Sequence, residues 1–187
     1  MIVGIDEVGR GCWAGPLVAG AVALHEPIIG LNDSKKLTKL QRERLTAEIE
    51  VSAVGIGLGW VTPMEIDEFG LTQAVRLAMH RALAQITIPY DEIIIDGNIN
   101  FFADDPRAKA IIKADGSVPA VSAASIVAKV ARDRWMQRAA LEFPVYGFEK
   151  HVGYGTKQHQ TMLQTYGICK LHRKSYKPVQ AVLESTS

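Results

Sequence analysis

The chain has 187 residues, of which 48% are hydrophobic and 22% are charged, and a formal net charge of +1, which together predict one globular domain with a sizeable core. No apolar run is long enough to span a membrane and nothing at the N-terminus resembles a signal peptide, so we expect neither a membrane protein nor an exported one. Because Cys12 and Cys169 show neither metal-binding spacing nor a disulfide framework, we expect a cytoplasmic protein.

The chain opens with an apolar strand, residues 2–5, that leads directly into Asp6 and Glu7 and then into a Gly-Arg-Gly turn. Burying an unpaired carboxylate costs free energy or raises its pKa, so a pair in this position indicates a cation, most often a divalent metal ion. The small apolar residues 17–24 predict a second, buried strand that pairs with the first.

Helix caps and glycines mark the next elements. Thr38 and Gln41 form a capping-box pattern that begins a charged helix, and Thr62, followed by proline, begins another. Between them, residues 54–60 alternate larger apolar residues with glycine, which predicts a strand with one bare face against which a helix or another backbone packs closely. A longer helix with an apolar stripe is predicted over residues 72–85.

The second half of the chain alternates strand and helix. Residues 92–96 predict a buried strand ending in a carboxylate, and residues 109–113 a short strand followed by another acid. A long alanine-rich helix is expected over 119–141, and a capped helix follows within 156–167. This order of elements indicates a three-layer α/β domain with a mixed sheet. One face of the long helix carries three polar side chains at spacings of three and four, namely Ser122, Ser125 and Lys129.

Three acids follow apolar strands: Asp6, Asp96 and, slightly offset, Asp115. Ligands of open α/β sheets bind outside the carboxyl ends of the strands, so these acids are expected to converge on one site. The alternative is that each acid caps a helix or starts a turn, which is most serious for Asp96 and Asp115 because glycine follows both. Oxygen ligands without histidine or cysteine favour Mg²⁺ or Mn²⁺, and two such ions can promote displacement at phosphorus.

The position of Glu7 next to Asp6 raises a geometric difficulty. Adjacent residues of a regular strand point to opposite faces of the sheet, so both carboxylates cannot face one metal ion. We expect Asp6 to be a direct ligand and Glu7 to contribute at the margin, through its carbonyl oxygen or a water molecule.

Basic residues gather near the C-terminus, in the segment 146–178, which has six lysines and arginines against one acid. Aromatic residues are interleaved with these cations, a pattern typical of phosphate contacts combined with stacking on a sugar or base. The alternative is a solvated basic surface with no ligand. We favour a segment that contacts nucleic acid.

Seven sequence blocks together resemble bacterial ribonuclease HII, the type 2 ribonucleases H, over nearly the whole chain, from residue 2 to residue 179. The resemblance implies a single catalytic domain over 1–187 with a ribonuclease H-like fold, in which helices flank a five-stranded mixed sheet. It also implies that the catalytic and metal-binding acids are Asp6, Glu7, Asp96 and Asp115. The blocks are GIDEVGRG (4–11), DSKKL (33–37), IIIDG (93–97), KAD (113–115), SAASIVAKVARD (122–133), GYGTKQH (153–159) and HRKSYKPV (172–179).

The resemblance also implies substrate-binding residues. The backbone and side chain of the turn Gly9, Arg10 and Gly11 would read the 2′-hydroxyl of a ribonucleotide and the adjacent phosphate, and Tyr154 would pack on the sugar at the RNA–DNA junction. A 2′-hydroxyl is the atom that distinguishes RNA from DNA. Weaker candidates for contacts with the nucleic-acid backbone are Lys35, Lys36, Ser122, Ser125, Lys129, His172 and Arg173.

Two positions depart from the family pattern. Val152 stands where lysine is common, so one phosphate contact is expected to be missing. Tyr176 stands where phenylalanine is usual, and this exchange is expected to be harmless. Asp133 is also acidic, but its arginine neighbours indicate an ion pair on the helix surface rather than a catalytic role.

The resemblance therefore implies an endoribonuclease that uses two Mn²⁺ or Mg²⁺ ions to hydrolyse the RNA strand of RNA–DNA hybrids. It would also cut on the 5′ side of single ribonucleotides in duplex DNA, leaving 3′-hydroxyl and 5′-phosphate ends. We expect a monomer whose partners are these nucleic acids, with no membrane.

Three alternatives are a nuclease of the same fold that ignores the 2′-hydroxyl, such as a junction resolvase, a non-catalytic nucleic-acid-binding module, and a nucleotide-binding oxidoreductase. The last is disfavoured because the third glycine of the turn comes one residue late and Pro16 leads into a strand instead of a helix.

Overall fold

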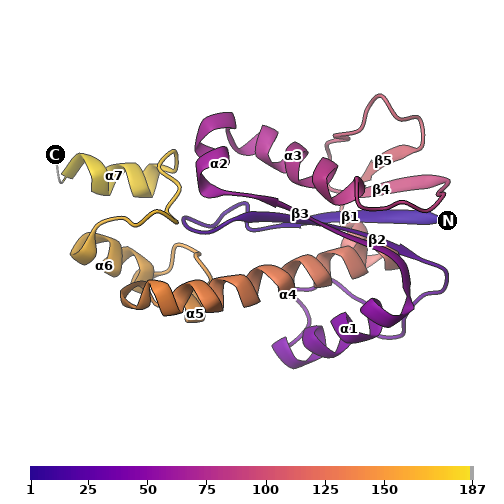
Figure 1. The fold of residues 1–187 in the computed structure, drawn as a ribbon, viewed down its shortest axis with the longest axis horizontal. Helices are drawn as coiled ribbons and strands as arrows, with labels where there is room; N and C mark the ends of the chain where they lie inside the picture. The colour runs from indigo at the N-terminus through magenta and orange to yellow at the C-terminus, as the bar shows by residue number, and fades with distance from the viewer. Residues whose placement is uncertain (186–187) are drawn as a thin grey trace.

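A five-stranded mixed sheet forms the centre of the fold, which a computed structural model describes for residues 1–185 (Figure 1). The strand order is β3-β2-β1-β4-β5, in which β1 runs antiparallel to β2 and parallel to β4. This arrangement confirms the predicted fold class. The strands are β1 (Ile2–Val8), β2 (Leu17–Leu24), β3 (Ala53–Val61), β4 (Glu92–Asp96) and β5 (Ala108–Ile111).

Helices cover both faces of the sheet. Two of them, α2 and α3, lie on one face, while α1 and the long α4 lie on the other, and α5 to α7 gather at the end of the sheet away from the N-terminus (Figure 1). Among residues 1–185, no helix is both long and apolar enough to cross a bilayer. The helices are α1 (Lys39–Ser52), α2 (Pro63–Phe69), α3 (Leu71–Leu83), α4 (Pro119–Glu142), α5 (Phe148–His151), α6 (Lys157–Tyr166) and α7 (Lys177–Ser185), with 3₁₀ turns η1 (Ala114–Gly116) and η2 (Pro144–Tyr146).

Local sequence chemistry explains where α1 and α2 begin. The Thr38 hydroxyl accepts a hydrogen bond from the Gln41 N–H, and the Gln41 side chain accepts one from the Thr38 N–H. The same reciprocal pair joins Thr62 and Glu65 at the start of α2. The predicted capping box at Thr38 and the predicted helix start at Thr62 are therefore confirmed, and each capping box satisfies N–H groups that the first helical turn leaves without partners.

Glycines allow the helices to approach the sheet closely. A Cβ atom at Gly59 would lie 1.9 Å from the Ala78 carbonyl oxygen of α3, which confirms that the bare face of β3 packs against a helix. On the opposite face, a Cβ at Gly4 would lie 2.2 Å from the backbone of Ala120 in α4. Two apolar cores result, one between the sheet and α3 and one between the sheet, α1 and α4.

Two predicted boundaries near the acids are wrong. The first strand does not end before the carboxylates, since β1 continues through Val8 and pairs Asp6 with Gly20 of β2. The strand predicted over residues 109–113 is β5, which ends at Ile111, and Asp115 lies in the 3₁₀ turn η1, which leads into α4. Lys113, just before this turn, has a left-handed backbone with φ of 59°.

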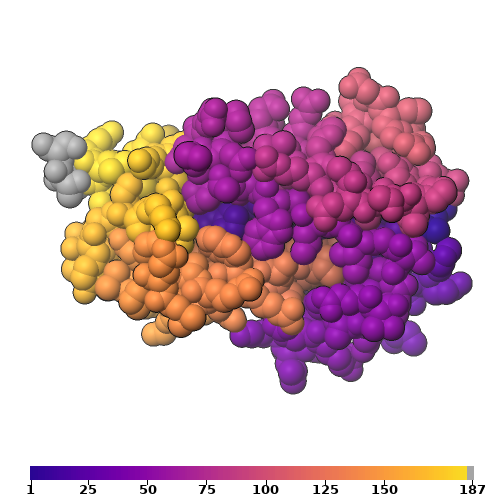
Figure 2. Space-filling model, in the orientation of Figure 1, coloured from indigo at the N-terminus to yellow at the C-terminus, as the bar shows by residue number. Residues whose placement is uncertain are grey.

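The C-terminal segment closes one end of the molecule. Residues after α6 pack beside α2, as the yellow and purple surfaces in Figure 2 show. The Asp67 carboxylate of α2 accepts hydrogen bonds from the backbone N–H groups of Lys174 and Ser175, at 2.9 and 2.8 Å. These bonds fix the turn that precedes α7.

Candidate active site

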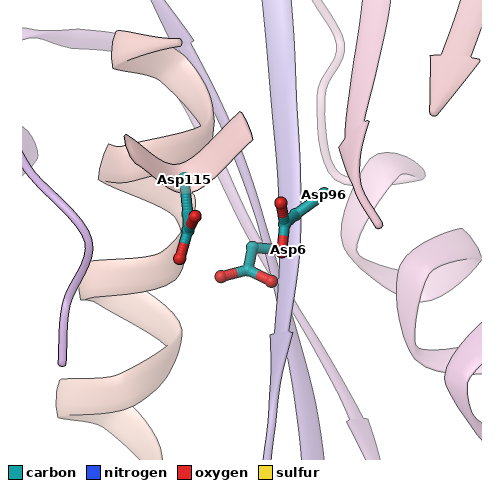
Figure 3. Close-up of side chains that lie close together, drawn as sticks. All are labelled: Asp6, Asp96 and Asp115. Atoms are coloured by element: carbon teal, nitrogen blue, oxygen red, sulfur yellow. The ribbon is translucent and has the colours of Figure 1, made fainter. Parts of the chain in front are cut away.

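Three of the four predicted acids meet in space. Carboxylate oxygens of Asp6, Asp96 and Asp115 all lie within 4.8 Å of one another, and the three side chains point toward a common centre (Figure 3). Two of them are brought together by the sheet, since β1 and β4 are parallel neighbours with Ile5 opposite Ile95. The third comes from η1, beside the N-terminal end of α4.

Hydrogen bonds hold each acid in place. The Ala114 N–H donates to the Asp96 carboxylate at 2.8 Å, which ties β4 to η1. The Ser122 hydroxyl of α4 donates to the Asp115 carbonyl oxygen at 2.6 Å. The Asp6 carboxylate accepts a hydrogen bond from the Glu7 N–H at 2.7 Å and another from the Ser125 hydroxyl.

The basic groups Arg10 and Lys35 act on the carboxylates of this site but do not offset the effect of their burial. Burial, together with the neighbouring Glu7, raises the pKa of Asp6 from 3.8 to about 8. Burial also raises the pKa of Glu7 in spite of Arg10, and burial and then Asp96 raise the pKa of Asp115. A group of buried carboxylates with raised pKa values is suited to a divalent cation, and oxygen-only ligands favour Mg²⁺ or Mn²⁺. The residues present therefore fit such an ion.

Glu7 lies outside the close group of three acids. Its carboxylate pairs with the Arg10 guanidinium at 3.2 Å, and its side chain lines the same pocket as Asp6 and Asp96. This arrangement agrees with a marginal role for Glu7, although its role toward a metal ion stays a prediction.

A pocket of about 210 Å³ joins the acids to the predicted substrate residues. Gly9 has φ of +93°, and a Cβ there would lie 2.4 Å from the Arg132 side chain, so the turn requires glycine at this position. Lys36 is exposed outside the pocket, and Ser122 is buried beneath η1. The residues that line the pocket are Asp6, Glu7, Val8, Gly9, Arg10, Gly11, Ser34, Lys35, Asp96, Ser125, Lys129 and Tyr154.

Tyr154 is 40% exposed at this pocket, as its glycine neighbours suggest. Its backbone pairs with that of Cys12 in an isolated antiparallel bridge, which places it beside the Gly-Arg-Gly turn. The Lys129 ammonium lies 5.9 Å from the centre of the Tyr154 ring and 2.8 Å from the Asp133 carboxylate. Asp133 therefore forms the expected ion pair on α4, with Lys129 as its partner.

Two predicted contacts with the nucleic-acid backbone do not fit the structure. His172 is 2% exposed and Arg173 is 0% exposed, so neither side chain offers surface to a substrate. Arg173 instead donates to the carbonyl oxygens of Arg10 and Gly15, at 3.0 Å each. Charge patterning in the sequence cannot reveal burial of this kind, because the partner carbonyls lie in a distant loop.

The segment 146–178 was predicted to contact nucleic acid, but several of its aromatic residues and histidines are buried. Tyr146 and Phe148 are buried and form a cluster with three buried histidines. Within the cluster the Nε2 atoms of His159 and His172 lie 3.0 Å apart, and burial lowers the pKa of each to about 4. The lysines of the segment remain exposed and are its available basic groups, namely Lys150, Lys157, Lys170, Lys174 and Lys177.

The two residues that depart from the family pattern, Val152 and Tyr176, both contact buried arginines. Val152 adopts a left-handed backbone with φ of 44°, which is strained for a β-branched residue, and its carbonyl accepts a hydrogen bond from Arg132 at 2.9 Å. The Tyr176 hydroxyl donates to the Arg10 carbonyl and lies 2.9 Å from Arg173 Nη1. Phenylalanine could not make these contacts, and the expectation that the exchange is harmless stays a prediction.

Ser34 is a site residue that the sequence analysis missed. It is 5% exposed, lines the pocket, and its Oγ lies 2.9 Å from Ser125 Oγ. In the sequence, Ser34 is marked by its position directly before Lys35 and Lys36, the two residues of this block that were predicted to contact the substrate.

The sequence and the fold are similar to those of known proteins. Residues 3–179 match the sequence family described as Ribonuclease HII. The chain is 48% identical to Ribonuclease HII of Shewanella piezotolerans over 96% of its length and 90% of that protein, and 46% identical to Ribonuclease HII of Bacillus anthracis over 98% and 71%. The crystal structure of ribonuclease H2 from Pyrococcus horikoshii superposes with a TM-score of 0.84 at 28% identity, covering 98% of this chain and 97% of that one. The chain therefore belongs to the ribonuclease HII family and is a metal-dependent endoribonuclease that acts on RNA–DNA hybrids.

Proposed function

We propose that this enzyme cuts on the 5′ side of single ribonucleotides embedded in duplex DNA, as well as within RNA strands of hybrids, and leaves 3′-hydroxyl and 5′-phosphate ends. The observation that carries the proposal is that one pocket is lined both by the acids Asp6 and Asp96 and by the Gly9–Gly11 turn with Tyr154. Because a turn that binds the 2′-hydroxyl would lie next to the catalytic acids, cleavage would depend on the presence of a ribonucleotide.

The residues that would hold two Mg²⁺ or Mn²⁺ ions are Asp6, Asp96 and Asp115, with Glu7 in support. When bound, such ions would activate the attacking water and stabilise the charge on the departing oxygen. The protein contributes a rigid arrangement of ligands, because the Asp6 and Asp96 carboxylates and the backbone beside Asp115 are fixed by hydrogen bonds. Without a cation, burial of the Asp6 carboxylate next to Glu7 disfavours its charged form, and the pKa of Asp6 is therefore raised.

The substrate would be held by groups around the pocket. The Gly11 N–H of the turn has no acceptor among the described residues, and nothing lies within 4 Å of a Cβ at Gly11, so this N–H can serve a ligand. The half-exposed Arg10 and the exposed Lys35 add positive charge for phosphates, and Tyr154 presents a ring for packing on a sugar. The exposed lysines of the segment 146–178 would contact the nucleic-acid backbone further away.

The test compares three labelled duplexes of one sequence: all DNA, DNA with one ribonucleotide, and an RNA–DNA hybrid. Each is incubated with Mg²⁺ or Mn²⁺, and the product ends are mapped at single-nucleotide resolution. We expect one cut on the 5′ side of the ribonucleotide, cleavage of the hybrid, and no cleavage of the all-DNA duplex. Cutting of the all-DNA duplex at the same rate would favour a nuclease that ignores the 2′-hydroxyl.

A variant separates catalysis from binding. Asp96→Asn should abolish metal-dependent cleavage and leave hybrid binding measurable by fluorescence anisotropy, because the pocket residues that contact the substrate are unchanged. Full activity of this variant would remove the metal-site proposal. Binding without cleavage by the wild-type protein, under any metal and salt condition, would identify a non-catalytic binding module instead.

A further inference from the structure

Two side chains from the C-terminal segment, those of Arg173 and Tyr176, bind the carbonyl oxygen of the peptide that joins Arg10 to Gly11. The Arg10 carbonyl oxygen accepts a hydrogen bond from Arg173 Nη1 at 3.0 Å and another from the Tyr176 hydroxyl. A carbonyl oxygen has two lone pairs, so these two donors saturate it.

The orientation of this carbonyl determines what the turn offers to a ligand. A trans peptide is planar, and its N–H points opposite to its C=O. Because the Arg10 carbonyl faces the buried Arg173, the Gly11 N–H faces away from Arg173, and Gly11 is one of the residues that line the pocket. Within residues 1–185 no protein group accepts a hydrogen bond from this N–H, so it is available to a ligand.

The holding groups are themselves firmly placed. Arg173 Nε and Nη2 both donate to the Gly15 carbonyl, at 3.1 and 3.0 Å, and no carboxylate among the described residues pairs with this guanidinium. Arg173 and Tyr176 also contact each other, with Nη1 2.9 Å from the phenol oxygen. The turn between them is tied to α2 through the Asp67 carboxylate. The arrangement thus links α2 to the substrate pocket through rigid contacts.

We propose that Tyr176 and Arg173 are positioning residues for ribonucleotide recognition: they hold the Arg10 carbonyl inward and thereby present the Gly11 N–H to the 2′-oxygen of the substrate. The inference rests on the proposed function, in which this turn reads the 2′-hydroxyl. It assigns a task to the Tyr176 hydroxyl that phenylalanine at this position could not perform. Arg173 alone would leave one carbonyl lone pair free and the peptide less firmly oriented.

The experiment uses the full chain and the matched pair of variants Tyr176→Phe and Tyr90→Phe. Both remove one phenol oxygen, but Tyr90 precedes β4, at the end of this strand opposite Asp96. For each protein, kcat and KM are measured with Mg²⁺ on a duplex that contains one ribonucleotide. The identical all-DNA duplex is then added as a competitive inhibitor, and its inhibition constant reports binding that does not depend on the 2′-hydroxyl.

We expect Tyr176→Phe to lower kcat/KM on the ribonucleotide duplex by about 3- to 10-fold, which corresponds to the loss of one hydrogen bond. The inhibition constant of the all-DNA duplex should not change, and Tyr90→Phe should match the wild type in both measurements. Arg173→Lys, which cannot form the same fork of hydrogen bonds, should cause a larger loss in the same direction. If that variant does not fold, Tyr176→Phe alone decides the result.

Two results would overturn the inference. One is an unchanged kcat/KM in Tyr176→Phe, and the other is an equal loss of affinity for the all-DNA duplex, which would indicate general support of the fold. Failure of the proposed function has a different signature, because the wild-type enzyme itself would then fail to distinguish the two duplexes.

Discussion

Replacing Asp6 by asparagine should make the metal-free protein more stable while abolishing its activity. Asparagine has nearly the same shape, and its carbonyl oxygen can still accept the hydrogen bond from the Glu7 N–H. The substitution removes a buried carboxylate whose pKa is raised by burial and by Glu7. The Asp6 carboxylate therefore destabilises the wild-type fold whenever no cation is bound.

The size of the effect follows from linkage. The pKa of Asp6 is about 8 in the folded protein and 3.8 as the ordinary value, so the native state binds more protons than the unfolded state between these pH values. Stability must then fall as pH rises from about 4 to about 8. At about 1.4 kcal/mol per pKa unit, the free energy of unfolding is lower at pH 7 than at pH 4 by roughly 4 kcal/mol. Structural relaxation reduces this loss to about 2–4 kcal/mol.

The assay is thermal unfolding at pH 7 in the presence of a chelator. Asp6→Asn should raise Tm by roughly 5–15 °C, given about 2–4 °C per kcal/mol for a chain of this size. The control Asp104→Asn, at an exposed loop residue, should leave Tm unchanged. Addition of Mn²⁺ should stabilise the wild type more than Asp6→Asn, because only the wild type has all three acids. An unchanged or lower Tm of Asp6→Asn under chelation, or retained cleavage activity, would refute this reasoning.

Three further predictions concern packing, pH and the serine link. Gly59→Ala would place a Cβ 1.9 Å from a backbone oxygen of α3, so the free energy of unfolding in urea should fall by about 3 kcal/mol, and an unchanged midpoint would contradict this. Because burial lowers the pKa of His159 and His172 to about 4, the unfolded state binds more protons below pH 6.5, and stability should fall as pH drops from 6.5 toward 4. The measurement is urea unfolding in the Asp6→Asn background, which removes the contribution of Asp6, while the opposing contributions of Glu7 and Asp115 remain. A stability that rises as pH drops from 6.5 toward 4 would be inconsistent with buried neutral histidines. Ser34→Ala should lower kcat about 5-fold with little change in KM, since it removes one hydrogen bond behind the Asp6 carboxylate; steady-state kinetics with an unchanged kcat would argue against this link.

The secondary structure was predictable wherever local chemistry determines it. Thr38 and Thr62 mark helix starts through capping boxes, and the alternating glycines of β3 indicate the close approach of a helix. The continuation of β1 through Val8 was not predictable in this way, because it depends on pairing with β2. The placement of Asp115 was equally non-local in origin, since a 3₁₀ turn beside α4 carries it to the two acids of the sheet.

The chemistry of the site was predicted better than its supporting contacts. Acids after apolar strands indicate a metal site whatever the details of the fold, and Asp6, Asp96 and Asp115 do converge. Arg173 was misassigned because a cation in a basic segment resembles a surface group, whereas its partners are carbonyls more than 150 residues away in sequence. The contact between Tyr176 and Arg10 depends on the same long-range packing and has no signature in the sequence.

The most direct test of the central claim is anomalous scattering from crystals of the enzyme grown with Mn²⁺. We predict an anomalous peak among the carboxylates of Asp6, Asp96 and Asp115, within coordination distance of their oxygens. The same peak should be lost in Asp96→Asn crystals. Mn²⁺ bound elsewhere with these three carboxylates free, at a concentration that supports cleavage, would contradict the account.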